Sequence, residues 1–264
     1  MWVCLPGRRS IRALSLLLLS FLVLANAGHG VESASEPDTL AAINLDQSPL
    51  AFEANRGQTD PAVAYLARAQ GCTVFVTPGE TVLSLCSPSS GGARTVSVLR
   101  MRCVDGNLHA STTGGEEMPG RVHYFRSSHP DRWHTDIPVY RQVRLAQIYP
   151  GIDLVYYGCG RQLEYDFVVS PGADPTHITL AFDGVEHTVL DDTGNLELQL
   201  PEGQLVVRRP VLYQEKQGAR VPIEGGFALL PGNRVAFEVG PYDSALALTI
   251  DPVFGLAYST YLGG

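Results

Sequence analysis

Apolar and polar residues alternate along most of the chain, and a period of two residues predicts β-strands rather than helices. Three segments with this alternation are 95–104, 152–157 and 162–169. Further segments of the same kind are 178–182, 188–190, 196–200, 204–207, 211–216, 220–223, 226–230, 234–239 and 246–250. Clusters of Gly, Pro, Asn and Asp separate these segments about every eight to twelve residues, which is typical of all-β domains.

The pattern therefore predicts an all-β fold in which antiparallel, β-sandwich-like sheets pack face to face. We expect many short strands, tight turns and few short helices. Residues 49–257 are expected to form one β-rich module, with two packed sub-sheets as one arrangement of it. Helical segments are expected only near 60–68 and 142–148.

The N-terminus has the three parts of a signal peptide. Three arginines precede an apolar run at 13–24, and residues 25–27, Ala-Asn-Ala, are the small residues that a signal peptidase requires. An uncleaved anchor is the alternative, but the run is shorter than the ~20 residues that cross a bilayer as a helix. We predict a cleavable signal peptide at 1–27, a flexible leader at 28–48, and a secreted or extracytoplasmic protein, in the periplasm or at the cell surface. No membrane span is expected after cleavage.

Charge excludes one class of partner. The chain has a formal net charge of −8, and removing residues 1–27, which contain three arginines and no carboxylate, lowers it to −11. An acidic domain is repelled by a phosphate backbone, so nucleic acid is not an expected partner. The acidic balance is compatible with binding of a cation such as calcium.

Four cysteines follow the predicted signal peptide, at Cys72, Cys86, Cys103 and Cys159. Segments 72–76 and 81–86 flank a turn sequence and predict a hairpin. If the hairpin is centred on Gly79, Cys72 lies opposite Cys86, within disulfide reach. Cys103 then remains for Cys159. Four buried free thiols are the alternative, because a single sequence does not establish pairing.

Several segments together carry a family resemblance. They are Phe52-Glu53-Ala54-Asn55-Arg56-Gly57-Gln58, 149–157, 163–169, 171–175, 250–252 and the final segment 258–264. They resemble the uncharacterised N-terminal domain of bacterial secreted proteins that contain SBBP, or β-propeller, repeats. The resemblance covers about residues 49–264, and 258–264 is similar to the start of a first repeat that is truncated here. It implies a β-rich extracytoplasmic module of no assigned activity that precedes propeller repeats, and it supplies no catalytic residues.

One set of carboxylates is a candidate site. Glu164 and Asp166 lie two residues apart on a predicted strand and so share a face, and Asp153 lies across the predicted hairpin. Convergence of the three would suit a calcium site or a glycosidase acid/base pair. The alternative is the solvated face of a half-buried strand.

The other polar clusters favour structural roles. Asn55, Arg56 and Gln58 form the most distinctive cluster, which we interpret as amides that cap a turn, with ligand binding as the alternative. The histidines at 123, 129 and 134 do not have the spacing of a zinc site. Trp133, between two prolines, is expected to anchor a loop by burying its ring in the core.

No nucleophile elbow, Ser-x-x-Lys motif or phosphate-binding loop is present in the sequence. We therefore favour a non-catalytic secreted or cell-surface β module with a structural, adhesion or binding role. Its expected partners are propeller repeats in the same chain or another cell-surface protein. The alternative is a carbohydrate-active or glycan-binding domain that uses Asp153, Glu164 and Asp166 with Tyr156 and Tyr157.

Overall fold

A computed structural model describes residues 50–69, 71–88, 94–126, 128–159, 162–201 and 203–259. The described part contains seventeen strands and two 3-10 turns, η2 (Pro130–Arg132) and η3 (Pro175–His177). The first strands are β1 (Phe52–Ala54), β2 (Tyr65–Ala69), β3 (Cys72–Val76), β4 (Glu80–Pro88), β5 (Arg94–Cys103), β6 (Ser111–Tyr124), β7 (His134–Tyr149), β8 (Ile152–Cys159) and β9 (Gln162–Val169). The remainder are β10 (Thr179–Asp183), β11 (His187–Leu190), β12 (Leu196–Leu200), β13 (Gly203–Lys216), β14 (Ala219–Ile223), β15 (Gly225–Leu230), β16 (Arg234–Val239) and β17 (Leu248–Ser259). The predicted all-β class is confirmed.

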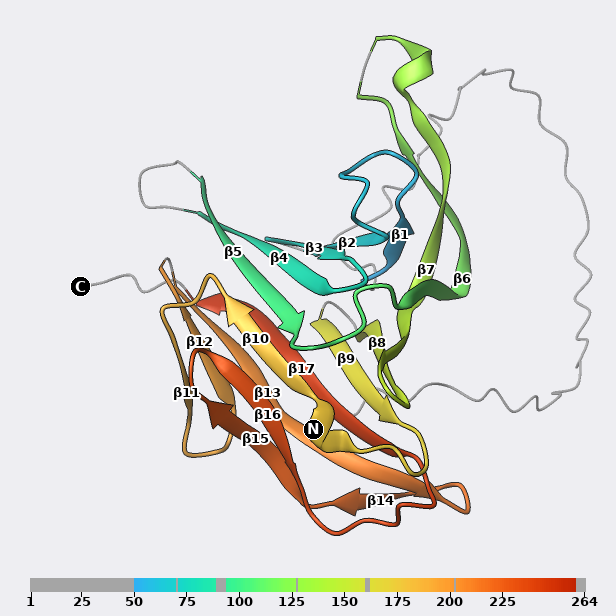
Figure 1. Cartoon of the computed structure of the whole chain (residues 1–264). Coiled ribbons are helices and arrows are strands. Elements are labelled where there is room, and N and C mark those ends of the chain that lie inside the picture. The colour runs from blue at the N-terminus through green and yellow to red at the C-terminus, as the bar shows by residue number, and fades with distance from the viewer. Residues whose placement is uncertain are drawn as a thin grey trace, which may run out of the picture. The chain divides into compact units, whose positions relative to one another are not determined.

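The strands form one antiparallel sheet that curls into a nearly barrel-shaped body (Figure 1). One wall runs by successive pairing from β16 through β10, β5, β4, β3 and β2 to β1. From β1 the pairing passes to β7 and on through β8, β9 and β17 to β13, which forms the opposite wall. The packed faces of the expected sandwich are thus two walls of a single continuous sheet.

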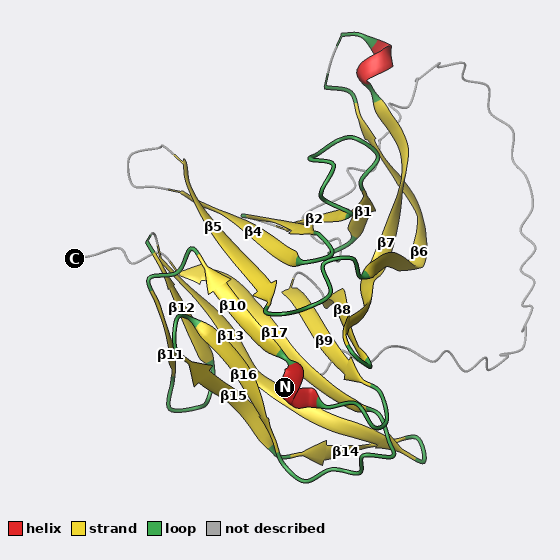
Figure 2. Ribbon diagram, viewed as in Figure 1, coloured by secondary structure: helices red, strands yellow, loops and turns green. Residues whose placement is uncertain are grey.

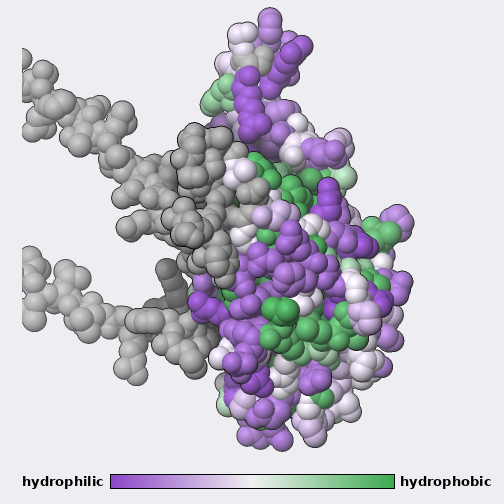
Figure 3. Space-filling model, turned by 90° about the vertical axis from the view of Figure 1, so that its left-hand side faces the viewer, coloured by the Kyte–Doolittle hydropathy of each residue, from purple (hydrophilic) through white to green (hydrophobic). Residues whose placement is uncertain are grey.

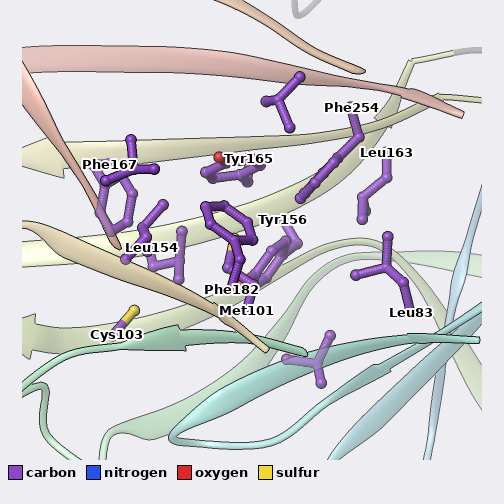
Figure 4. Close-up of a cluster of buried hydrophobic side chains, with 14 of the residues drawn as sticks. Leu83, Met101, Cys103, Leu154, Tyr156, Leu163, Tyr165, Phe167, Phe182 and Phe254 are labelled. Carbon is purple, nitrogen blue, oxygen red and sulfur yellow. The ribbon is translucent and has the colours of Figure 1, made fainter. Parts of the chain in front are cut away.

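The core fills the space between the two walls. On β9 the odd positions Leu163, Tyr165 and Phe167 are fully buried, as strand alternation requires when one face is turned inward. The Tyr165 ring packs on Phe254, with ring centroids 5.1 Å apart (Figure 4). Thr81 Oγ1 of β4 donates a hydrogen bond of 2.6 Å to Tyr156 Oη of β8, which links the walls through the core.

The two helices expected at 60–68 and 142–148 are absent, and this prediction was wrong. The first segment is a turn that leads into β2, and the second lies within β7. Here a bulge shifts the register between Leu145 and Tyr149, and Gln147 has a φ of 55°. Because of the extra residue in the bulge, the buried residues Leu145 and Ile148 are three positions apart instead of two. This spacing resembles that of a helix.

The register expected for the β3–β4 hairpin was also wrong. Val76 pairs with Thr81, so Cys72 pairs with Leu85 and not with Cys86. A slip of one residue reverses the face of every side chain, so Cys72 is buried while Cys86 lies on the outer face. Cys72, Cys86 and Cys103 are free thiols, and neither expected disulfide, Cys72–Cys86 or Cys103–Cys159, is formed.

A long hairpin projects from the body. β6 and β7 pair along most of their length, and β1 pairs with β7 at Tyr140, near the point where the hairpin leaves the sheet (Figure 1). The η2 turn lies at the far end of the hairpin (Figure 2). We call the end of this hairpin, residues 121–138, the arm. β6 was not predicted, because both of its faces are largely exposed and its sequence therefore has little alternation.

The expectations for residues 1–27 and 28–48 concern positions outside the described residues. At the other end, β17 continues to Ser259, and the remainder of the predicted repeat start lies beyond the described part. Within the described residues, none of the helices has the length and apolar character needed to cross a membrane.

Candidate functional site

Three carboxylates gather on the outer face of β9 and β17. Glu164 and Asp166 lie on β9, where Glu164 pairs with Tyr157 of β8. Ile250 of β17 pairs with Phe167, which brings Asp251 beside Asp166. Because the neighbouring residues on each strand point into the core, these four polar side chains share the outer face. We call Tyr157, Glu164, Asp166 and Asp251 the carboxyl cluster.

A tyrosine hydroxyl bridges two of the carboxyl groups. Tyr157 Oη donates to Asp166 Oδ1 at 2.9 Å and lies 3.4 Å from Asp251 Oδ1. Arg220 of β14 lies near both aspartates, with its guanidinium stacked 4.1 Å above the ring of Tyr213. Arg208 acts in the same way on Glu164, so the cluster has one fixed hydrogen-bond donor and two nearby positive charges for three carboxyl groups.

This arrangement favours a retained proton. Burial, and next the negative charge of Asp251, raise the pKa of Asp166 to about 7. Burial also raises the pKa of Asp251, and burial followed by the charge of Asp251 raises that of Glu164. Two neighbouring carboxylates do not both ionise readily, so burial and mutual repulsion favour retention of a proton by the Asp166 and Asp251 pair.

Asp153 does not join this cluster, so the three carboxylates of the candidate site, Asp153, Glu164 and Asp166, do not converge. Arg144 donates to Asp153 through both Nε and Nη2, and the backbone N–H of Gln147 donates to Asp153 Oδ1 at 2.7 Å. These bonds hold the β7 bulge in place. Tyr156, expected near the same site, faces the core and bonds to Thr81.

The Asn55–Gln58 loop is occupied by its own backbone. Asn55 Nδ2 donates to the carbonyls of Asp60 and Val63, each at 2.8 Å, and Asn55 Oδ1 accepts from Gly57 N at 3.0 Å. Gln58 Nε2 donates to the carbonyl of Ala54 at 2.8 Å, while Gln58 Oε1 accepts from Arg56 N. The two amides thus cap this turn, as we inferred from the sequence. The Arg56 side chain is exposed.

Gly57 in this loop has a φ of 103°, a conformation that favours glycine. A Cβ there would lie 2.9 Å from the ring of His134. His123 accepts a hydrogen bond from Asp136 N at 3.1 Å. His123 and His134 therefore make different contacts. Among the described residues, no three His, Cys, Asp or Glu side chains are grouped as metal ligands.

Sequence reasoning missed the exposed rings of the arm. Phe125 is 62 % exposed and Trp133 39 % exposed, with ring centroids 5.0 Å apart in an edge-to-face contact. The expectation that Trp133 is buried in the core was therefore wrong. The sequence does contain a signal of this site, because Phe125 and Trp133 flank a turn that contains Pro130. It does not show that this turn lies at the end of a projecting hairpin.

The arm is attached to the body through a buried carboxylate that was also missed. Tyr124 Oη donates to Glu53 of β1, which is almost fully buried, and Arg68 Nη2 of β2 donates to Tyr124 Oη at 3.1 Å. Arg126 lies over the Tyr124 ring at 4.9 Å. The acidic residue of the Phe52–Gln58 segment thus fixes the base of the arm.

Two surface clefts are formed by other residues. One is lined by Leu190, Arg209, Phe227 and Glu238, and the other by residues of β13, β14 and the 241–246 segment. Neither cleft is lined by a member of the carboxyl cluster. The cluster therefore lies on a sheet face and not within one of these clefts.

Comparison with known proteins gives a family but no activity. No curated protein and no solved structure matches the chain significantly. A family model matches residues 52–253, which is most of the chain and includes every described element from β1 through the first half of β17. The chain belongs to the family described as a domain of unknown function, DUF7948.

Proposed function

We propose that this chain is a non-catalytic, extracytoplasmic β module with a structural or adhesion role. Its contact element is the arm, and its partners are β-propeller repeats that follow such a module or another cell-surface protein. The observation that carries the proposal is a contrast. The candidate chemical groups Asn55, Gln58 and Asp153 are occupied by contacts of the fold, whereas the large rings of Phe125 and Trp133 are exposed on a projecting hairpin.

The composition of the arm supports a protein contact. Trp, Phe, Tyr and Arg are enriched in protein interfaces, and Trp, Tyr and Arg dominate their binding energy. The arm places Phe125 and Trp133 beside Arg126 and Arg132. Its base is fixed by Glu53 and Tyr124, so docking does not require ordering of the hairpin at its root.

The proposal is tested with the purified chain and a separately produced array of SBBP-type repeats. Calorimetry is expected to detect binding that Phe125→Ser with Trp133→Ser weakens at least tenfold. Val96→Ser is the matched control, because Val96 is an exposed apolar residue on β5, and it is expected to leave binding unchanged. Absence of binding would contradict propeller repeats as the partner, and equal loss in the control would contradict the role of the arm as the contact element.

Glycan chemistry is the second candidate, and the carboxyl cluster favours it. A protonated carboxyl beside an ionised one is the arrangement of glycosidase acid/base pairs. Polysaccharide hydrolysis, measured as released reducing ends, distinguishes the two candidates. The leading proposal expects no release above that of Asp166→Asn with Glu164→Gln, and release that this double variant abolishes would establish the second.

A further inference from the structure

The arm ends in a convex aromatic knob. Phe125 contacts Trp133 edge-to-face, and the His123 ring stacks on Phe125 with centroids 6.1 Å apart. Because the rings pack on one another and do not lie in one plane, the tip is a knob and not a flat platform on which a sugar ring stacks. A convex apolar knob fits a concave apolar surface.

The knob carries positive charge in an acidic chain. Residues 123–134 contain Arg126 and Arg132 against one carboxylate, Asp131, whereas the whole chain has a net charge of −8. Arg121, just outside this segment, is paired with Glu117 at 2.7 Å and with Asp136 at 3.5 Å. Arg126, whose guanidinium lies over the Tyr124 ring, and Arg132 have no ion pair among the described residues, so the charge of each can attract a partner of opposite charge.

The body offers a surface of complementary shape and charge. A cleft of about 270 Å³ lies between β11 and β15, with Leu190 and Phe227 in its lining and Arg209 held at its wall by the carbonyl of Gly225. Exposed Leu229, two residues from Phe227 on β15 and so on the same face, extends the apolar surface beside it. Figure 3 shows an apolar area on the body, on the side where Figure 1 shows these strands.

Carboxylates lie beside this cleft. Glu238 lines it, and Asp191 and Asp192 directly follow Leu190. Hydrogen bonds, first from the Thr193 side chain, lower the pKa of Asp191 to about 2, so it is ionised at neutral pH. Three carboxylates, Glu238, Asp191 and Asp192, thus stand against one cation, Arg209, at this cleft, and this balance suits the arginines of the arm.

The arm and the strands β11 and β15, which border the cleft, lie at opposite ends of the body (Figure 1). A molecule therefore cannot place its own arm in its own cleft. We propose that the arm of one molecule docks in the β11–β15 cleft of a second copy. This contact is heterologous and produces head-to-tail chains or rings. It rests on the proposed role of the arm as a contact element.

Sedimentation velocity of the purified protein over a range of concentrations tests the proposal. Association is expected at low ionic strength and should weaken as salt is raised from about 0.05 to 0.5 M, because screening reduces attraction between exposed charges. Phe125→Ser with Trp133→Ser, the arm variant, and Asp192→Lys with Leu190→Ser, the cleft variant, should each weaken association at least tenfold.

Mixing the two variants gives the decisive measurement. The arm variant keeps an intact cleft and the cleft variant keeps an intact arm, so the mixture should form dimers that do not grow further. Val221→Ser, in the second cleft, is the control and should associate like the wild type. Thermal unfolding of each variant separates loss of contact from loss of fold.

Three results would overturn the inference: a wild-type protein that stays monomeric at low salt, variants that associate normally, or a mixture that stays monomeric. A monomer that still binds SBBP-type repeats through the arm would refute self-association alone and leave the proposed function intact.

Discussion

Replacing Asp166 by asparagine should make the protein more stable at alkaline pH, because the carboxyl cluster opposes ionisation of this residue. The pKa of Asp166 in the folded protein is about 7, against 3.8 for an unperturbed aspartate, and burial is the main cause. The folded state therefore binds this proton more tightly than the unfolded state. The resulting stability is complete below about pH 4 and is lost as pH rises through about 7.

The magnitude follows from the difference between the two pKa values. Each unit corresponds to about 1.4 kcal/mol, so complete ionisation of Asp166 costs at most ~4 kcal/mol. Partial access of the cluster to solvent and the repulsion shared with Asp251 reduce this to roughly 2–3 kcal/mol. Asparagine carries no charge and still accepts the hydrogen bond of Tyr157 through its amide oxygen.

Urea unfolding of the wild type and of Asp166→Asn at pH 4.5 and 8.5 measures the effect. The variant should be more stable than the wild type by roughly 2–3 kcal/mol at pH 8.5, and within ~0.5 kcal/mol of it at pH 4.5. Glu215→Gln, at an exposed position on β13, is the control and should keep the pH dependence of the wild type. An Asp166→Asn variant with the same loss of stability between the two pH values would refute the reasoning.

Four further predictions follow. Tyr165 Oη is buried without a hydrogen-bond partner, so Tyr165→Phe should raise the free energy of unfolding by ~1 kcal/mol; destabilisation in urea would contradict this. Asn55→Ala removes three hydrogen bonds of its loop and should cost ~2–3 kcal/mol by the same measurement, a cost that Asn55→Asp should only partly avoid. Asp153→Ala should cost ~2 kcal/mol, below the usual cost of breaking a buried pair because the Arg144 left behind is 59 % exposed, whereas Arg144→Ala should cost more because it leaves the buried Asp153 carboxylate without its cation. Mass spectrometry of the exported protein should find Gly28 as its first residue; an intact N-terminus would contradict the predicted signal peptide.

The alternation of side chains determined which segments become strands and which face of each strand turns inward. On β9, the buried residues Leu163, Tyr165 and Phe167 follow directly from the period of two. The turn at 77–80 was predicted from Pro78 and Gly79, since these residues have strong turn preferences. Such features depend on neighbouring residues in the chain, and the sequence therefore contains them.

Only the tertiary structure decided which strands pair, in which register, and which side chains meet. Asp251 joins Asp166 because β17 returns to pair with β9 some 80 residues later, and no local pattern encodes that pairing. Cys72 pairs with Leu85 and not with Cys86, and the local turn sequence does not distinguish these two registers, which differ by one residue. Trp133 is exposed because its turn ends a hairpin that leaves the sheet. The alternation of residues determines which side chains share a face of a strand. Which strands pair, and which face is exposed to solvent, is determined by long-range packing of the whole sheet.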